Sequence, residues 1–293
     1  MRLATFTYRG RTRLGVVVEQ EIVDLTAGAA WLPMGVRQLL EAGPNALSAA
    51  RLAVARSKQR IPLADVRLEA PIRDPQKFLG LGFNYRSHVE EIRSRFPEMP
   101  IPRHQVWFNK QVSCITGPYD AIRKPASSDS LDYEGELAVV IGRRCRSIRA
   151  SAAKDFIAGL MVCNDVSVRE WQMRSPTATL GKSFDTHGPT GPWLTLTDEL
   201  DPRLRVRTSI NSATVQDGNT AEFVYSIGEM IEELSKVMTL MPGDILSTGT
   251  PSGVGAGAIP PRYLKAGDTV RVEIESLGHI ENTVVDDDQS EDA

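Results

Sequence analysis

Two glutamates at the start of an apolar run are the residues in this sequence that most strongly suggest chemistry. Glu134 and Glu136 precede residues 137–141 in the segment LDYEGELAVVIG, whose second half is rich in β-branched residues and predicts a strand. Side chains alternate along a strand, so both glutamates point to one face, with Cα atoms roughly 6.5–7 Å apart. If that face is buried, the two carboxylates repel each other, and a cation between them would relieve the repulsion. The alternative, two exposed glutamates at a strand end, stays open.

A third carboxylate, Asp165, follows the apolar run of residues 160–163. It could join a site at the edge of a sheet, or it could cap the helix predicted to follow it. Three carboxylates without a cysteine or histidine partner describe a site for a hard cation, which predicts Mg²⁺ or Mn²⁺, with Ca²⁺ as a further candidate. The four histidines lack the H-x-x-x-H spacing that would favour zinc: His88, His104, His187 and His279.

His88 and Glu91 are three residues apart in a predicted helix, so their side chains lie on one face. In that arrangement the carboxylate orients the imidazole and raises its basicity, which suits a general base. A surface pair with no catalytic role is the alternative. Lys182 and Gln172 carry N–H groups that could stabilise a developing oxyanion, and both could equally be surface residues.

Residues 243–255 (GDILSTGTPSGVG) predict a strand that runs into a loop rich in glycine and hydroxyl groups. The backbone N–H groups of such a loop can bind a carboxylate or a phosphate. The loop lacks the lysine of a P-loop, and its glycines do not have the G-x-G-x-x-G spacing. Nucleotide binding is therefore the weaker interpretation.

Composition excludes several broad classes of protein. The 293 residues carry a net charge of −3, so no excess of positive charge favours nucleic acid or an anionic membrane. The three cysteines are odd in number, and none has C-x-x-C spacing, which predicts reduced thiols and a cytoplasmic protein. The N-terminus has no apolar signal segment, and no run of 18 uncharged apolar residues could span a membrane.

The predicted elements must place these candidate residues around one site. We expect a small β-rich N-terminal module over residues 1–70, with helices at residues 36–40 and 46–58 separated at Pro44. A larger catalytic body should follow over residues 71–286, mostly strands, and residues 287–293 read as an acidic tail. Its longest helix is predicted at residues 226–240, where Ser226 and Glu229 form a capping box. Strands that outnumber helices predict an α+β fold built on a rolled or sandwiched sheet.

Five motifs, in this order along the chain, resemble those of the fumarylacetoacetate hydrolase family. They are GFNY followed by His88 and Glu91, DYEGEL from Asp132, NDVS followed by Gln172, GKSFD from Gly181, and GTPSGVG from Gly249. The resemblance covers roughly residues 70–286 and is closer to the shorter bacterial members. One upstream aspartate ligand of the eponymous enzyme has no equivalent here, and residues 93–104 match no family pattern.

This resemblance implies a strand-dominated mixed β-sandwich roll that is usually a homodimer. It implies a divalent metal held by Glu134, Glu136 and Asp165, and a lid helix that brings His88 and Glu91 over the substrate. Lys182 and Gln172 would then lie on the polar side of the pocket. Further candidates for substrate binding within or beside these motifs are Asn84, Tyr85, Arg169 and Thr250.

Family substrates are 2-oxo acids and their enols, and family reactions vary, so fold alone does not give the activity. The leading hypothesis is a metal-dependent hydrolase that cleaves a C–C bond in an acylpyruvate-like 2,4-dioxo acid, with water activated by His88 and Glu91. The alternative is a decarboxylase or an enol–keto isomerase acting on a 2-oxo dicarboxylate in the catabolism of aromatic compounds. A non-catalytic protein that binds a small molecule is a third class, which would not need the acid–base pair.

Overall fold

The computed structural model describes residues 1–28, 31–98, 100, 102–197 and 203–287. Its N-terminal part contains five strands, of which three form a meander and two follow the helices: β1 (Arg2–Tyr8), β2 (Arg11–Val18), β3 (Glu21–Asp24), β4 (Ile61–Pro62) and β5 (Arg67–Glu69). The helices are α1 (Leu25–Gly28), α2 (Val36–Glu41) and α3 (Pro44–Arg56). Both predicted helices are present, but Pro44, which was expected to lie between them, is the first residue of α3, where its missing N–H costs nothing.

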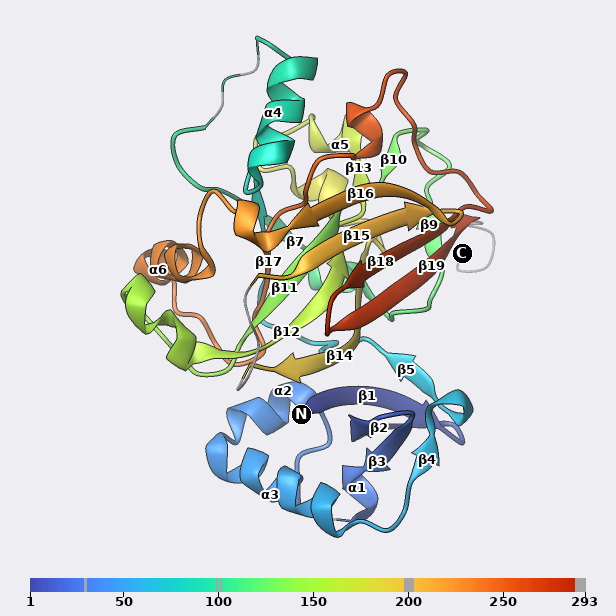
Figure 1. Cartoon of the computed structure of the whole chain (residues 1–293), viewed down its shortest axis with the longest axis vertical. Helices are drawn as coiled ribbons and strands as arrows, with labels where there is room; N and C mark the ends of the chain where they lie inside the picture. The colour runs from blue at the N-terminus through green and yellow to red at the C-terminus, as the bar shows by residue number, and fades with distance from the viewer. Residues whose placement is uncertain (29–30, 99, 101, 198–202, 288–293) are drawn as a thin grey trace.

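The N-terminal strands belong to the same sheet as the body of the protein (Figure 1). β1 pairs antiparallel with β14 (Gly188–Leu196), and the strand order is β4-β3-β2-β1-β14-β12-β11-β17-β6-β7. The central members are β6 (Phe78–Gly82), β7 (Val106–Lys110), β11 (Gly135–Ile141), β12 (Ile157–Asn164) and β17 (Ile245–Ser247). One apolar core joins Leu3 and Val36 to Val140, so the two parts pack directly on each other.

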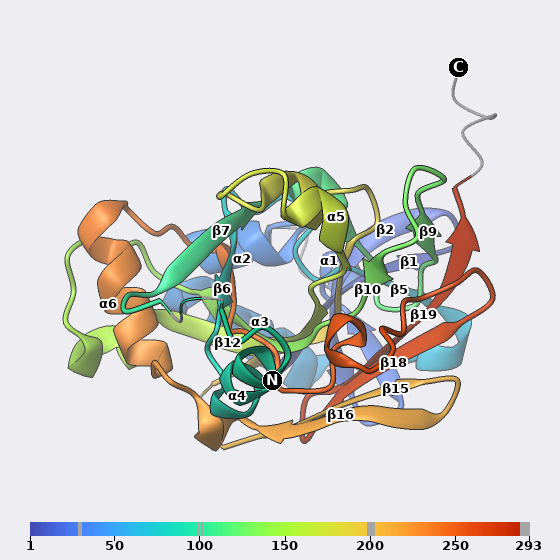
Figure 2. The same cartoon turned by 90° about the horizontal axis from the view of Figure 1, so that it is seen from above.

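A second sheet packs against the first and completes a sandwich. Its order is β16 (Ala213–Asn219), β15 (Arg205–Ile210), β18 (Thr269–Ile274), β19 (Gly278–Asp286) and β9 (Ile122–Lys124). Leu137 and Val139 of β11 lie in one core with Val206 and Val272 of this second sheet. Seen from above, the second sheet lies along one side of the body (Figure 2). In the first sheet β17 runs parallel to β6, and β8 (Ile115–Thr116) runs parallel to β14, while the other pairs are antiparallel. The expected α+β, mixed sandwich is therefore confirmed.

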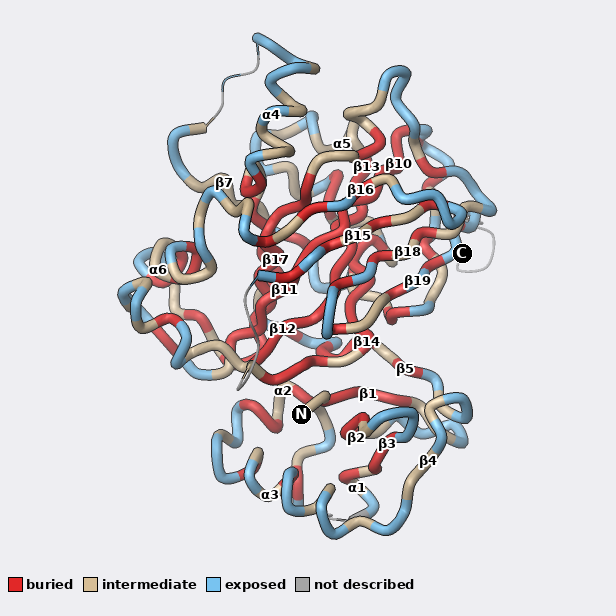
Figure 3. The backbone as a smooth tube through the Cα atoms, in the orientation of Figure 1, coloured by how far each residue is buried: buried red, intermediate tan, exposed pale blue. Residues whose placement is uncertain are grey.

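Three helices border the body. α4 (Arg86–Arg95) and the short α5 (Arg169–Gln172) lie at the end opposite the N-terminal strands (Figure 1). α6 (Ile227–Val237) begins at the predicted capping box, in which Ser226 and Glu229 bond reciprocally. Figure 3 shows that α4 is largely accessible while the strands β11, β12 and β17 are buried. Among the described residues, no helix is long and apolar enough to cross a membrane.

The remaining elements are short. They are the strands β8 (Ile115–Thr116), β10 (Leu131–Asp132) and β13 (Ser167–Val168), and the 3₁₀ turns η1 (Leu63–Asp65), η2 (Val112–Cys114), η3 (Ala150–Phe156), η4 (Thr179–Lys182), η5 (Thr220–Glu222) and η6 (Gly255–Gly257). β10 pairs with β13, which holds the chain before β11 against the chain after β12. The acidic tail predicted at residues 287–293 lies almost wholly outside the described residues.

Candidate active site

Glu134, Glu136 and Asp165 lie together, with one carboxylate oxygen from each within 4.8 Å of the others. We call these three residues the acidic cluster. The pairing of β11 with β12 brings them together, because Gly135 faces Asn164 across the ladder. Just beyond that pair, the Asp165 amide donates a hydrogen bond to the carbonyl of Glu134 at 2.8 Å. The sequence prediction that these three carboxylates share one buried place therefore agrees with the geometry.

Two members of the acidic cluster have cationic partners. Glu134 is bound by Arg169 Nη1 and by Lys182 Nζ, each at 2.6 Å. Asp165 is bound by Lys110 Nζ and by Lys182 Nζ, each at 2.7 Å. Burial raises the pKa of Glu134, but Arg169 and Lys182 outweigh burial and hold that pKa well below its usual value, with a smaller contribution from His88.

Among the described residues, Glu136 is the member of the cluster that forms no ion pair with a cationic side chain. Only 2% of it is exposed, and its carboxylate accepts hydrogen bonds from the Gly249 amide at 2.9 Å and from the Ser247 hydroxyl. Burial raises the pKa of Glu136 well above its usual value, and the charges of Asp165 and Glu134 raise it further. A divalent cation among the three oxygens would balance this charge. The donor set, three carboxylates at short range, therefore fits a hard cation such as Mg²⁺ or Mn²⁺.

Lys182 and Gln172 come from neighbouring turns, η4 and α5. Gly181 makes this possible, since a Cβ there would lie 2.2 Å from the backbone nitrogen of Gln172. Arg169 Nη1 donates to Gln172 Oε1 at 3.0 Å, so the amide oxygen of Gln172 is engaged. Its NH₂ group is thereby left as the end that can donate to a substrate oxygen.

His88 and Glu91 form the predicted pair on α4, with Nδ1 of the imidazole 2.8 Å from Glu91 Oε2. A carboxylate can only accept, so the neutral imidazole carries its proton on Nδ1 and offers the lone pair of Nε2. The other Glu91 oxygen accepts a hydrogen bond from the Gly253 amide at 2.8 Å. This second contact joins α4 to the loop that follows β17.

The loop within residues 243–255 was expected to offer its N–H groups to a carboxylate or a phosphate. Three of these N–H groups, and that of the following Ala256, instead bind carboxylates of the protein itself. Gly249 donates to Glu136, Gly253 to Glu91, and both Gly255 and Ala256 to Asp132, at 2.7–2.9 Å. The loop is therefore a scaffold that holds acidic side chains in place.

Three of the predicted substrate-binding residues also belong to the scaffold. Asn84 is fully buried, donates to the Thr248 carbonyl and accepts from the Tyr225 amide, each at 2.8 Å. Thr250 is buried, donates to the Gly135 carbonyl and accepts from Gln216. Tyr85 is fully buried and packs edge-on against Phe223. Sequence does not reveal the direction of a side chain, and these three point into the protein.

Arg169 was also expected to bind substrate, and its guanidinium is engaged with protein groups. Besides Glu134 and Gln172, it binds Asp132 Oδ2 from both Nε and Nη2 at 2.8 Å. Asp132 itself is fully buried. In this arrangement Arg169 orients Glu134 and Gln172.

Sequence reasoning missed Lys110 and the role of Asp132. Lys110 is not among the predicted site residues, yet it ends β7 and is fully buried beside Asp165. Burial lowers the pKa of Lys110, but the neighbouring carboxylate outweighs burial and raises it above its usual value. An isolated lysine at a strand end carries no signal for such a contact. The DYEGEL motif did contain Asp132, which could have been singled out there.

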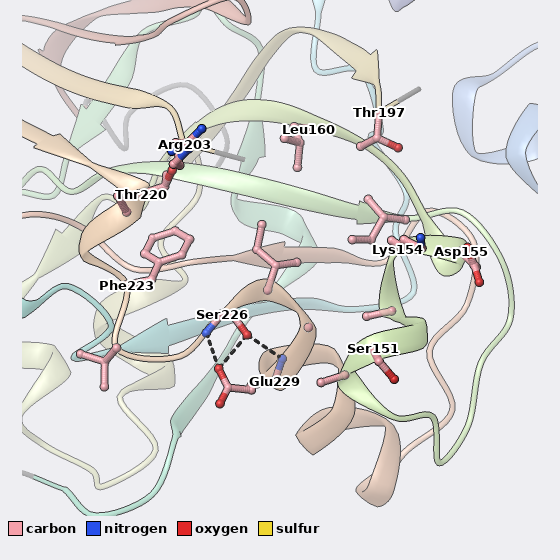
Figure 4. A pocket seen from close by; sticks show the side chains of 17 residues that line it. Ser151, Lys154, Asp155, Leu160, Thr197, Arg203, Thr220, Phe223, Ser226 and Glu229 are labelled. Carbon is pink, nitrogen blue, oxygen red and sulfur yellow. Dashed lines mark hydrogen bonds between the residues drawn. The ribbon is translucent and has the colours of Figure 1, made fainter. Parts of the chain in front are cut away.

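A separate cavity of about 920 Å³ lies between η3 and the N-terminus of α6 (Figure 4). Ser226 and Glu229 on its wall bond to each other in the capping box, as the dashed lines show. Of the described residues that line this cavity, none belongs to the acidic cluster or to the His88–Glu91 pair. We therefore place the candidate active site at the acidic cluster.

Comparison with known proteins identifies two family models that match this chain. The model of the family described as "Fumarylacetoacetate (FAA) hydrolase C-terminal" matches residues 77–285, and one described as "Rv2993c-like, N-terminal" matches residues 1–71. The mitochondrial oxaloacetate tautomerase Fahd2a of Rattus norvegicus is 43% identical over 267 residues, which are 90% of this chain and 84% of the rat protein.

Two solved structures extend the comparison. Maleylpyruvate hydrolase from Sphingobium sp. SYK-6, in complex with manganese(II) and pyruvate, is 34% identical with a TM-score of 0.81, covering 98% of this chain and 99% of its own. The 2-hydroxyhepta-2,4-diene-1,7-dioate isomerase from Mycobacterium marinum is 33% identical with a TM-score of 0.76, covering 99% and 100%.

Proposed function

The chain belongs to the fumarylacetoacetate hydrolase family, and from that premise we propose that it is a divalent-metal-dependent enol–keto tautomerase acting on a 2-oxo dicarboxylate such as oxaloacetate. The family includes both hydrolases and isomerases, so the reaction must be argued from the site. The similarity to the rat oxaloacetate tautomerase favours the isomerase alternative over the C–C hydrolase that led the sequence analysis.

The observation that carries the proposal is the pair of hydrogen bonds that the Glu91 carboxylate accepts. Both of its carboxylate oxygens are occupied, one by His88 Nδ1 and one by the Gly253 amide. Among the described residues no partner of His88 Nε2 is found, so this nitrogen is the one through which the pair can carry a proton. Tautomerisation needs one proton moved between carbon and oxygen with no net water, and a single carrier suffices for it.

Glu134, Glu136 and Asp165 would hold the cation, which when bound supplies Lewis-acid polarisation of the 2-oxo group. The relative with bound manganese(II) and pyruvate supports Mn²⁺ or Mg²⁺ in this role. Lys182 contributes an ammonium beside the cluster, 2.6 Å from Glu134. Gln172 contributes an amide whose NH₂ end is free to donate, because Arg169 holds its oxygen.

The proton path follows from these roles. In the keto-to-enol direction, His88 Nε2 takes a proton from C3 of the substrate, and the electron pair of that C–H bond forms the C2–C3 double bond. The C2 oxygen then carries the negative charge, which the N–H donors of Lys182 and Gln172 stabilise until His88 Nε2 delivers the same proton to that oxygen. Glu91 holds the imidazolium that forms at His88. The reverse direction returns the proton to C3, so atoms and charge balance without water.

Hydrolysis of an acylpyruvate remains the second candidate, because the maleylpyruvate hydrolase of 34% identity shares the fold. It requires His88 to activate a water molecule against the distal carbonyl and releases pyruvate or a related 2-oxo acid. Decarboxylation of a 2-oxo dicarboxylate would use the same acidic cluster and would depend less on the general base.

The test compares two substrates with Mg²⁺, with Mn²⁺ and after chelation. Loss of the ultraviolet absorbance of enol-oxaloacetate reports tautomerisation, and released pyruvate reports hydrolysis of an acylpyruvate. We expect a metal-dependent acceleration with enol-oxaloacetate and little pyruvate from the acylpyruvate. The reverse pattern would assign the protein to the hydrolases.

We further propose that two copies form a homodimer in solution. The resemblance to a family whose members are usually dimeric is the basis of this proposal. Light scattering should give twice the 32.2 kDa of one chain, and a mass near 32 kDa at micromolar concentration would contradict it.

A further inference from the structure

Lys110 is the last residue of β7 and contacts the acidic cluster through Asp165. Its ammonium has three acceptors: Asp165 Oδ1 at 2.7 Å, the carbonyl of Lys182 at 2.5 Å and the carbonyl of Val166 at 3.4 Å. An ammonium has three N–H donors, so these contacts use all of them. Lys110 is also fully buried, and it therefore has no group left with which to reach a substrate.

We propose that Lys110 is a positioning residue that fixes the acidic cluster for the cation and Lys182 for the substrate. By holding Asp165 Oδ1, it fixes a carboxylate whose other oxygen, Oδ2, shares the Lys182 ammonium with Glu134 Oε2. By holding the Lys182 carbonyl, it fixes the backbone from which the Lys182 side chain enters the cluster. This inference rests on the metal site of the proposed function and adds to it a residue that touches neither metal nor substrate.

The surroundings of Lys110 explain why its contacts persist. A lysine charge that is fully removed from water is costly unless it is paired and hydrogen-bonded, and here Asp165 supplies the pairing. The ring of Phe78 lies 5.9 Å from the Lys110 ammonium on an apolar side. Leaving Asp165 and the two carbonyls would therefore cost the Lys110 ammonium its pairing and its hydrogen bonds.

Charge and positioning predict opposite results when Lys110 is removed. A positive charge beside a cation site repels the cation, so a purely electrostatic role means that the loss of Lys110 strengthens metal binding. A positioning role means that Asp165 turns away from the cluster and metal binding weakens. The sign of the change in metal affinity therefore separates the two roles.

The experiment is titration of Lys110→Met with Mn²⁺ alone, followed by electron paramagnetic resonance of the free ion. Methionine keeps the length and apolar stem of lysine without its charge or donors. We expect Mn²⁺ to bind about 10–100-fold more weakly than to the wild type, the usual effect of losing a residue that orients a metal ligand. Binding as tight as in the wild type, or tighter, would overturn the proposal.

Lys77→Met is the matched control. Lys77 Nζ binds the fully buried Asp244 at 2.9 Å, so this variant also breaks a lysine–aspartate pair, but away from the acidic cluster. It should keep the wild-type affinity for Mn²⁺, and equal weakening in both variants would also overturn the proposal. If Lys110→Met does not fold, Lys110→Gln replaces it under the same criterion, because glutamine keeps an N–H donor without the charge.

This readout does not depend on the substrate. A wild-type protein that binds Mn²⁺ but does not accelerate enol-oxaloacetate loss contradicts the proposed function and leaves the inference on Lys110 open to the same titration. A wild-type protein that binds no Mn²⁺ contradicts both.

Discussion

Glu91 Oε1 accepts a hydrogen bond from the backbone amide of Gly253 at 2.8 Å. This contact attaches α4, which carries His88, to the loop whose other amides hold Glu136 and Asp132. The loop requires glycine at position 253, where φ is +104° and a Cβ would lie 2.0 Å from the Val215 carbonyl. One backbone loop therefore sets the position of the proposed general base and of a proposed metal ligand together.

Removing the His88–Glu91 pair should affect turnover and not metal binding. His88→Ala should reduce turnover by roughly 10²–10⁴-fold, the usual range for loss of a general base. Glu91→Gln should act in the same direction, because its amide would donate to Nδ1 and place the imidazole proton on Nε2, where the lone pair is needed. Steady-state rates with Mn²⁺ affinity measured in parallel provide the check. Wild-type rates in both variants would mean that His88 and Glu91 form a surface pair with no catalytic role.

Glu136→Gln should abolish the stabilisation that a divalent cation provides. A cation at 100 times its dissociation constant stabilises the folded protein by about 2.7 kcal/mol, which the variant should lose. Without metal the variant should be at least as stable as the wild type, since it no longer buries an unbalanced charge. Thermal unfolding with Mn²⁺ and with a chelator measures both effects. An equal shift by Mn²⁺ in the variant and the wild type would argue against Glu136 as a ligand.

Asn84→Ala tests the assignment of Asn84 to the scaffold. The substitution leaves the Tyr225 amide and the Thr248 carbonyl without their partner, which costs about 1–3 kcal/mol for each buried group. We expect a lower free energy of unfolding and an unchanged KM in the folded fraction. Urea unfolding together with substrate kinetics distinguishes the two roles, since a residue that binds substrate would raise KM and leave stability unchanged.

His187 should make the protein less stable in mild acid. Its imidazole is fully buried and donates from Nε2 to the Arg123 carbonyl at 2.9 Å. The pKa of His187 is lowered from 6.5 to about 3. Burial is the main cause and the charge of nearby Lys110 acts in the same direction, while the hydrogen bond to Arg123 opposes both.

The sign of the effect follows from this low folded-state pKa. Below pH 6.5 His187 binds a proton in the unfolded chain but stays neutral in the folded protein. His187 therefore lowers the free energy of unfolding as pH falls from about 6.5 towards 3. Between pH 7 and pH 5 this amounts to about 2 kcal/mol. His187→Gln, which keeps a donor for the Arg123 carbonyl, should show a smaller loss of stability in urea unfolding. An equal loss of stability in the wild type and in His187→Gln would show that His187 is not the cause.

The sequence was sufficient where the signal is local or the residues lie on paired strands. Ser226 and Glu229 form the predicted capping box, because the bonds involve residues three apart. Glu134, Glu136 and Asp165 meet because they lie at the ends of the paired strands β11 and β12, and the apolar runs predicted those ends. Motif order then identified the family.

The remaining features depend on side-chain direction and on long-range pairing. Asn84, Tyr85 and Thr250 occupy motif positions but point into the protein, which their order along the chain cannot reveal. Lys110 meets Asp165 across 55 residues of sequence, and no spacing rule connects them. The division of the chain near residue 70 and the cytoplasmic location stay predictions.

The most direct test of the central claim follows oxaloacetate by proton NMR in D₂O with Mg²⁺ and either wild-type protein or His88→Ala. Proton transfer at C3 through His88 predicts that the wild type exchanges the C3 protons for deuterium faster than Mg²⁺ alone, without forming pyruvate, and that the variant loses this acceleration. Pyruvate formed without faster exchange, or equal exchange by wild type and variant, would contradict the proposed tautomerase.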